Sequence, residues 1–443
     1  MTLDHLGKLT GYSAAQVSRY ERGKSPLTDM RVLGRFARAL DIPPQDLGLA
    51  PGPATGEESA GPNVAPVRVT REPEPAGIAA LGLDFPRAPA EAIGLAATYW
   101  RTVDRRHFLG GGFAAAAYHT PVTRWLTQPA DEPVAHRGGG RRVGRGDLTD
   151  LWQAADDARA ADSRFGGGDW RTSSVVQCLR LRAAPLLAGS YTEAVGTELL
   201  TATAELSRVA GWAAVDVGHH DQAQRHLVQA LRLARAAGDR EVGAYVLTTM
   251  ALHTLLRGHP QEGADMAEAA YERAKRVAAP RVLAFAKLIE ARAHARTGDS
   301  EATGRALARS EALLDSVESG RDPQWLAYFT HARLSADATE IHRDLRQPGA
   351  ALAWNGQASA MPADQFSRSV GMRLAILATV RLQHGDLDQS LSDGTRALQI
   401  LRTVSSPRAS SYVRQLLAAL KSRGADPRVA DFRQRALLEI NAV

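Results

Sequence analysis

The chain has 443 residues, of which 44% are hydrophobic and 23% charged, a balance typical of globular proteins with a large core. Its formal net charge of +6 is compatible with binding to nucleic acid but does not demonstrate it. The single cysteine, Cys178, excludes an intrachain disulfide, and no apolar run is long enough to cross a membrane. Because the N-terminus also lacks a signal-peptide pattern, we expect a cytoplasmic protein without membrane association.

The first ten residues are expected to form a short amphipathic helix. Thr2 is a candidate N-cap, because a threonine hydroxyl can accept a hydrogen bond from a free backbone N–H at a helix start. Gly7 is small enough for a second helix to cross closely at that point. The apolar stripe of this helix consists of Leu3, Leu6 and Leu9.

A second helix follows a tight turn and has two distinct faces. Gly11 relieves the left-handed position at the end of the first helix, and Ser13 can cap the next one. Val17 and Tyr20 lie three residues apart on a face that we expect to pack, while the opposite face stays free. Two short helices around a glycine turn form a helix-turn-helix unit, whose second helix enters the major groove of DNA.

The residues that follow complete a family pattern. A further amphipathic helix is expected over residues 30–40, and a last turn, PPQDL, over residues 43–47. The pattern SxxxVSRYERGK followed by LxRFAxALDIPPxDL resembles the DNA-binding domain of Cro/repressor-like (Xre-type) regulators. The resemblance implies double-stranded DNA as a partner. It also implies a homodimer, because DNA-binding domains of this type bind paired half-sites.

The resemblance also implies a role for each residue on the free face of the second helix. Arg19 is the candidate for a bidentate contact to guanine O6 and N7. Tyr20 and Glu21 match positions that hold the fold. The other expected DNA-binding residues meet base edges (Ala14, Ala15 and Ser18) or phosphate (Ser13, Gln16, Arg22 and Lys24).

The beginning of the chain departs from the family pattern. Domains of this type open with another helix that packs across the helix-turn-helix, and here the pattern begins after it. Either the true start lies upstream of the first residue given, or the reader is degenerate and leaves Leu6, Leu9 and Phe36 partly uncovered. We favour the first interpretation, because the second half of the pattern is complete.

Composition divides the rest of the chain into three parts. After a DNA-binding domain at 1–50, residues 51–90 are rich in Pro, Gly, Glu and Ser and are expected to be a disordered, flexible linker. Residues 91–146 form a helical and basic connecting segment, and residues 147–443 a tetratricopeptide-like repeat domain. The connecting segment contains RRHFL at 105–109, similar to a twin-arginine export signal; we interpret it as a helix with a basic start, because such signals belong at an N-terminus.

The C-terminal part of the chain repeats with a period of about 40 residues, which predicts an all-α fold. Turn glycines mark the period at Gly218, Gly258 and Gly298, and again at Gly385 and Gly424. Five positions after the first three turns stands a small residue or Thr, where the second helix of a hairpin crosses close to the first: Ala223, Gly263 and Thr303. We expect roughly six helical hairpins between about 170 and 440, stacked into an α-solenoid with a concave surface. A looser unit is expected around Leu345–Met361.

A second resemblance concerns this repeat region. The motif DxRFGGGxW at 162–170 and the segment 199–240 are similar to the repeats found behind Xre-type domains in actinobacterial regulators. The resemblance implies an effector peptide, small molecule or protein partner at the repeats.

Chemistry-bearing motifs are sparse. His219, His220 and His226 lack the spacing and acid of a metalloenzyme helix, so we expect a polar turn and no metal site. The glycine triplets at 110–112, 138–140 and 166–168 lack the Lys-Ser/Thr of a phosphate loop and are interpreted as flexible turns. We expect no catalytic residue and no cofactor, and Cys178 is interpreted as a buried, inert thiol. The aromatic residues nearest the looser unit are the candidates for an effector pocket: Trp325, Tyr328 and Trp354.

Three hypotheses of function follow. The first is a sequence-specific transcriptional regulator whose repeats receive an effector and control a tethered DNA reader. The second is a repeat scaffold for protein partners with a degenerate DNA-binding domain. The third is an exported protein that uses the internal Arg-Arg motif. We favour the first, and no enzymatic function competes with it.

Overall fold

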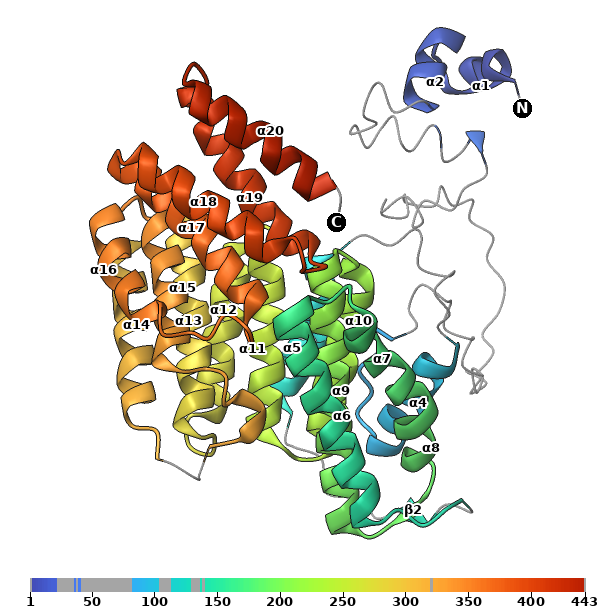
Figure 1. Cartoon of the computed structure of the whole chain (residues 1–443). Coiled ribbons are helices and arrows are strands. Elements are labelled where there is room, and N and C mark those ends of the chain that lie inside the picture. Colours follow the sequence, from blue (N-terminus) through green and yellow to red (C-terminus); the bar gives the residue numbers. More distant parts are fainter. Residues whose placement is uncertain are drawn as a thin grey trace. The chain divides into compact units, whose positions relative to one another are not determined.

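The computed structural model confirms the all-α fold and divides into two units, residues 1–72 and residues 73–443 (Figure 1). Most of the expected linker, the RRHFL motif and most of the helix expected at 30–40 lie outside the described residues. The structure describes residues 2–21, 36, 39–40, 82–102, 113–128, 136–137, 140–318 and 322–441.

The first unit contains the two short helices expected from the sequence, α1 (Leu3–Thr10) and α2 (Ala14–Glu21). The Thr2 side chain caps α1 by accepting a hydrogen bond from the backbone N–H of His5. Gly11 ends α1 in the left-handed region, with φ of 78°. A Cβ on Gly7 would lie 2.5 Å from the carbonyl oxygen of Tyr12, so the chain passes too close for any larger residue. All three local predictions are confirmed.

Three aromatic rings pack against one another among the described residues of the first unit. Tyr12, Tyr20 and Phe36 pack pairwise with ring centroids 5.8–6.1 Å apart. The contacts of Tyr20 confirm that it holds the fold, and Phe36 is 8% exposed. Leu9, by contrast, is 54% exposed on α1.

The second unit begins with helices that precede the repeats. We assigned residues 82–90 to the disordered linker. In the structure they instead lead into the helix that begins at Pro89, and Phe85 among them is buried. Two short antiparallel strands pair His136 with Tyr191. The elements of this part are α4 (Pro89–Thr102), η3 (Ala115–Tyr118), α5 (His119–Thr127), β1 (His136–Arg137), α6 (Arg145–Phe165), α7 (Trp170–Cys178), the π-helical η4 (Leu179–Ala183), α8 (Ala184–Leu187) and β2 (Ser190–Tyr191).

Six antiparallel helical hairpins follow in the described chain, as the sequence predicts. Figure 1 shows them stacked side by side as a solenoid of paired helices. They are α9 (Glu193–Val217) with α10 (His220–Ala236), α11 (Arg240–Leu256) with α12 (Pro260–Ala274), α13 (Pro280–Thr297) with α14 (Ser300–Asp315), α15 (His331–Asp344) with α16 (Pro348–Ala358), α17 (Ser367–His384) with α18 (Leu387–Leu401), and α19 (Pro407–Ala419) with α20 (Pro427–Asn441). Two short 3₁₀ segments, η5 (Gln324–Leu326) and η6 (Leu420–Arg423), interrupt the series.

The turns inside the hairpins explain the glycine period. Four of the five marker glycines adopt left-handed backbone conformations, with φ between 80° and 94°: Gly218, Gly258, Gly298 and Gly385. In the looser unit Arg346 adopts the same left-handed conformation, with φ of 58°. Because this turn contains no glycine at that position, the glycine period in the sequence does not mark it. Gly424 lies in the last turn but has φ of −63°.

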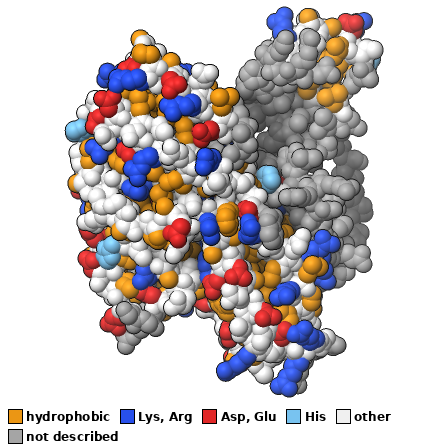
Figure 2. Space-filling view, in the orientation of Figure 1, with side chains coloured by type: hydrophobic (Ala, Val, Ile, Leu, Met, Phe, Trp, Pro, Cys, Tyr) orange, Lys and Arg blue, Asp and Glu red, His pale blue; other side chains and the backbone are white. Residues whose placement is uncertain are grey.

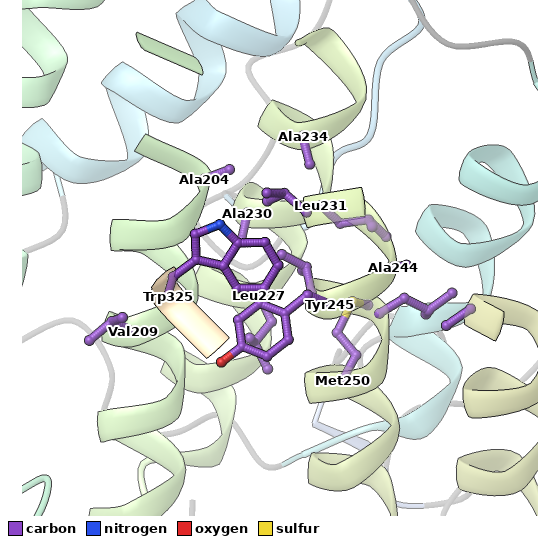
Figure 3. Packing of buried hydrophobic residues seen from close by; sticks show 14 of the residues in the cluster. Ala204, Val209, Leu227, Ala230, Leu231, Ala234, Ala244, Tyr245, Met250 and Trp325 are labelled. Carbon is purple, nitrogen blue, oxygen red and sulfur yellow. The ribbon is translucent and has the colours of Figure 1, made fainter. Parts of the chain in front are cut away.

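Close packing between helices buries the apolar side chains of the second unit in two main clusters. The largest cluster of buried residues runs from Phe85 to Ile341, and a second spans the last three hairpins. In Figure 3 the ring of Trp325 lies against Tyr245, with centroids 4.7 Å apart, beside leucines of the neighbouring helices. Gly263 confirms the expected close crossing, because a Cβ there would lie 3.1 Å from the carbonyl oxygen of Ala251.

The last two hairpins pack against helices from the beginning of the second unit. Helix α17 contacts α6, and α19 contacts α9. The glycine triplet at 166–168 forms the meeting point, where the N–H of Gly168 donates to the carbonyl of Ser405 over 3.0 Å. A Cβ on Gly167 would lie 2.5 Å from the carbonyl oxygen of Ala213. Our interpretation of this triplet as a flexible turn is therefore wrong: it is a site of close backbone approach.

Candidate nucleic-acid interface and central cavity

Helix α2 presents one face to solvent and buries the other. Arg19 and Ala15 are exposed one helical turn apart, whereas Val17 is 2% exposed. An arginine and a methyl group thus share one accessible stripe, which suits contacts with base edges in a major groove. The half-buried residues at the borders of this stripe are Ala14, Gln16 and Ser18.

Ser13 stands at the start of this helix and is exposed. Its Oγ accepts a hydrogen bond from the backbone N–H of Gln16 over 3.2 Å, which confirms the predicted cap. The hydroxyl hydrogen remains able to donate to a phosphate. Arg22 and Lys24 lie outside the described residues, and the DNA contacts of the whole set stay predictions.

A cavity of about 70 Å³ lies inside the second unit, enclosed by α6 and by the first helix of every hairpin. Five aromatic rings contribute to its wall: Trp212, Tyr245, Phe285, Tyr328 and Phe366. Six guanidinium groups converge on it: Arg159, Arg208, Arg292, Arg333, Arg368 and Arg408.

Ion pairs hold these arginines in place. Arg208 donates to both oxygens of Glu205 over 2.7 and 2.8 Å, and its guanidinium lies 4.3 Å from the centre of the Tyr245 ring. Arg292 bridges two carboxylates, Asp337 at 2.9 Å and Glu340 at 2.7 Å. The buried carboxylates that pair with the six arginines are Asp162, Glu205, Asp216, Asp337 and Glu340.

Arginines keep two carboxylates of this network, Glu205 and Asp216, ionised. Burial alone would raise the pKa of Glu205, but the charges and hydrogen bonds of Arg208 and Arg159 outweigh it and lower the pKa. The pKa of Asp216 is lowered in the same way, by Arg368 and Arg408 against burial. These two carboxylates therefore remain charged partners of the cavity arginines at neutral pH.

A wider vestibule of about 390 Å³ adjoins the cavity. It shares Arg159, Ser163, Tyr328 and Phe366 with the inner wall and adds Trp325 at its side. The structure thus brings two of the three expected pocket residues together. The third, Trp354 in α16, packs half-buried against the large core and is not among the lining residues of either space.

Tyr118, His253 and His220 form a chain of polar contacts, in which Tyr118 and His253 are buried and His220 is half-buried. The hydroxyl of Tyr118 lies 2.9 Å from Nδ1 of His253, whose Nε2 lies 3.2 Å from Nδ1 of His220. Burial lowers the pKa of His253 to about 3 and that of His220 to about 4. Within the part of the chain that the structure describes, no group of three or more His, Cys, Asp or Glu side chains could hold a metal ion.

Sequence reasoning did not find the cavity arginines. Five of them stand in the first helices of the hairpins and Arg159 stands in α6; Arg292, for example, lies in the alanine-rich stretch IEARAHA. A charged residue on a buried helix face is a usable signal, because such residues are rarely buried without a partner. Arg208 and Arg333 have partners in their own helices, Glu205 and Asp337, but the partners of Arg368 and Arg408 come from distant helices, which the sequence does not reveal.

Residues 1–49 match a family model described as a helix-turn-helix domain. None of the curated proteins matches this chain. The match covers α1 and α2, so the chain consists of an N-terminal helix-turn-helix domain followed by a large all-helical region of paired helices. Among the described helices, none is long and apolar enough to span a membrane.

Proposed function

We propose that this protein is a cytoplasmic, sequence-specific transcriptional regulator of the Xre type, whose tetratricopeptide-like repeats bind an effector. The match of residues 1–49 to a helix-turn-helix domain carries the proposal. The exposed stripe of α2 supports it, because Arg19 is exposed there and a guanidinium can donate to the O6 and N7 atoms of guanine. Readers of this kind bind paired half-sites, so we propose a homodimer as the DNA-binding form.

The central cavity is the proposed effector site. It is built from every hairpin of the solenoid, so a molecule bound there would contact helices far apart in the chain. Such a ligand can shift the arrangement of the hairpins in proportion to its differential affinity for two arrangements. An effector peptide, a metabolite and a protein segment are the candidate occupants.

We also propose that the protein binds and does not catalyse. Arginines hold the pKa values of Glu205 and Asp216 low, whereas a general base works best with a pKa near the operating pH. Figure 2 shows basic and acidic side chains interspersed on the visible face of the second unit, so that face offers no single-sign surface for DNA. We therefore assign DNA binding to the helix-turn-helix domain.

Selection of genomic DNA fragments by the purified full chain tests this function. The wild type should enrich a small set of fragments, and its affinity should fall steeply between 50 and 200 mM salt, as phosphate contacts require. Arg19→Ala should lower selective affinity about tenfold or more, because a bidentate base contact contributes about 1–3 kcal/mol.

Arg305→Ala is the matched control, since Arg305 is an exposed arginine in the second unit, with 65% of its side chain exposed. It should bind like the wild type. If the wild type binds no fragment with a salt-dependent affinity, the regulator proposal fails and the repeat scaffold with a degenerate reader takes its place.

A further inference from the structure

We propose that the central cavity binds a monocarboxylate, with the carboxylate among the arginines and an adjoining flat apolar group directed toward the vestibule. The proposal rests on the cavity being the effector site and names the chemistry of its ligand. Four features of the wall carry it: charge, an unpaired buried donor, aromatic surface and size.

The charge of the wall is not balanced. Six arginines line the cavity, and five buried carboxylates pair with them, which leaves one positive charge. The negative charge of Glu340 is shared with donors outside the six arginines, because Glu340 also accepts hydrogen bonds from Arg296 and Tyr412. A sixth carboxylate, Asp156, also pairs with Arg159, but 53% of its side chain is exposed, so this ion pair contributes less than the buried ones. One ligand anion would bring the buried set to neutrality.

One buried guanidinium nitrogen of the cavity wall has no partner among the described residues. Arg368 is 5% exposed, and its Nε is fully buried without a hydrogen-bond acceptor. Arg333 and Arg208 each use two nitrogens for protein acceptors: Nε and Nη1 in Arg333, and Nε and Nη2 in Arg208. The unpaired donor of Arg368 favours an oxyanion, because a buried donor without an acceptor costs about 1–3 kcal/mol.

The arginines are also held at the correct place before a ligand arrives. Arg408 donates from Nε to Asp216 over 2.9 Å, and its guanidinium lies 5.0 Å from the centre of the Trp212 ring. Arg208 is fixed in the same way between Glu205 and Tyr245. A preorganised donor set loses little side-chain entropy on binding.

Size and shape define the rest of the ligand. In this measure one water needs about 10–15 Å³, so the 70 Å³ cavity offers room for a carboxylate and only a few further atoms. The remainder must extend past Tyr328 and Phe366 into the 390 Å³ vestibule beside Trp325. These three rings suit a flat apolar group. A free aromatic acid and the C-terminal residue of a peptide both present this chemistry.

Calorimetry on the full chain without DNA tests the proposal, so its outcome is independent of the DNA-binding test. The probes are 3-phenylpropionate, its amide, and acetyl-Gly-Gly-Phe with a free or an amidated C-terminus. At least one acid should bind, and its amide should bind tenfold or more weakly. A tighter free acid identifies a small molecule as the source, and a tighter peptide acid identifies a peptide C-terminus.

Variants place the site. Arg333→Gln should weaken acid binding tenfold or more, while Asp337 keeps Arg292 as a partner. Arg408→Gln is a second variant with the same expectation, since Asp216 keeps Arg368. Arg305→Gln changes an arginine of α14 that does not line the cavity, so this variant should bind the acid like the wild type. The proposal is overturned if neither acid binds at millimolar concentration, or if acid and amide bind equally. It is also overturned if inorganic phosphate competes for the site as strongly as the acid itself binds. The last contrary outcome is that folded Arg333→Gln and Arg408→Gln both bind the acid like Arg305→Gln.

Discussion

Arg368 and Asp162 form a bidentate ion pair across 206 residues of sequence, with both N–H···O distances at 2.5 Å. The two side chains are 5% and 8% exposed. The pair joins α17 to α6, so it fixes the return of the last hairpins to the helices before the repeats. Arg368 also reaches Asp216 at 3.2 Å, which links the same arginine to α9.

Removing one member of this pair should destabilise the second unit strongly. Arg368→Met leaves Asp162 charged and buried, and breaking a buried pair from one side costs about 3–5 kcal/mol. The double variant Asp162→Leu with Arg368→Met removes both charges and should recover most of that loss. Urea unfolding followed by tryptophan fluorescence measures both. Equal stability of the single and double variants would show that the pair is not coupled.

Two glycines inside helices should respond to alanine in opposite directions. Gly304 in α14 has open space where a Cβ would stand, so Gly304→Ala should stabilise the fold by about 0.5–1 kcal/mol through helix propensity. A Cβ on Gly371 in α17 would lie 2.5 Å from Leu401, so Gly371→Ala should destabilise by about 1–3 kcal/mol. Urea unfolding of the two variants provides the comparison, and stabilisation by both would refute the packing at Gly371.

These cases show which features a sequence reveals. Caps and turns at Thr2, Gly11 and Gly218 could be predicted, because the residues that determine them lie within a few positions of one another. The hairpins could be predicted because their period recurs. The closure of α17 onto α6 could not be predicted, since the partner of Arg368 is distant in sequence and any buried acid would pair with it equally well.

The same distinction explains the candidate sites. The free face of α2 follows from helical period alone, so the exposure of Arg19 could be predicted. In the cavity, Trp325 and Tyr328 are conspicuous as aromatic residues near an irregular unit, and both line the described spaces. Trp354 is equally conspicuous but packs against the core, because its place on α16 depends on tertiary contacts.

Stability should fall as the pH drops below about 6.5, in part through His253. Burial, His220 and Arg257 lower the pKa of His253 to about 3, so the folded protein keeps this ring neutral while the unfolded chain protonates it near pH 6.5. Between these values the unfolded state binds one more proton, which removes about 1.4 kcal/mol of stability per pH unit. His253→Gln should make the slope between pH 4.5 and 6 shallower by that amount.

Urea unfolding at several pH values gives the slope. His331→Gln is the control, because His331 lies at the exposed start of α15, with 52% of its side chain exposed. Its slope should match the wild type. An unchanged slope in His253→Gln would mean that another group determines the acid sensitivity.

Arg232 should be a source of instability. It is 1% exposed in α10, and its three guanidinium nitrogens have no hydrogen-bond partner among the described residues. Burial lowers its pKa to about 10, although Asp84 and Glu91 oppose the shift. Arg232→Met keeps the apolar stem without the charge and should raise the free energy of unfolding by about 1–3 kcal/mol, measured in urea. A loss of stability would mean that the guanidinium is solvated or paired.

Gly7→Ala should disable the DNA reader while leaving the solenoid intact. An added Cβ would lie 2.5 Å from the carbonyl oxygen of Tyr12, and backbone cannot yield as a flexible side chain can, so α1 and α2 must separate. The seven tryptophans of the chain all lie beyond residue 72, so tryptophan fluorescence reports on the second unit alone. The fluorescence unfolding curve should match the wild type while fragment binding is lost. Lys8→Ala, an exposed neighbour on α1, should keep fragment selection. If Gly7→Ala still selects fragments, the close contact between the two helices is not required for reading DNA.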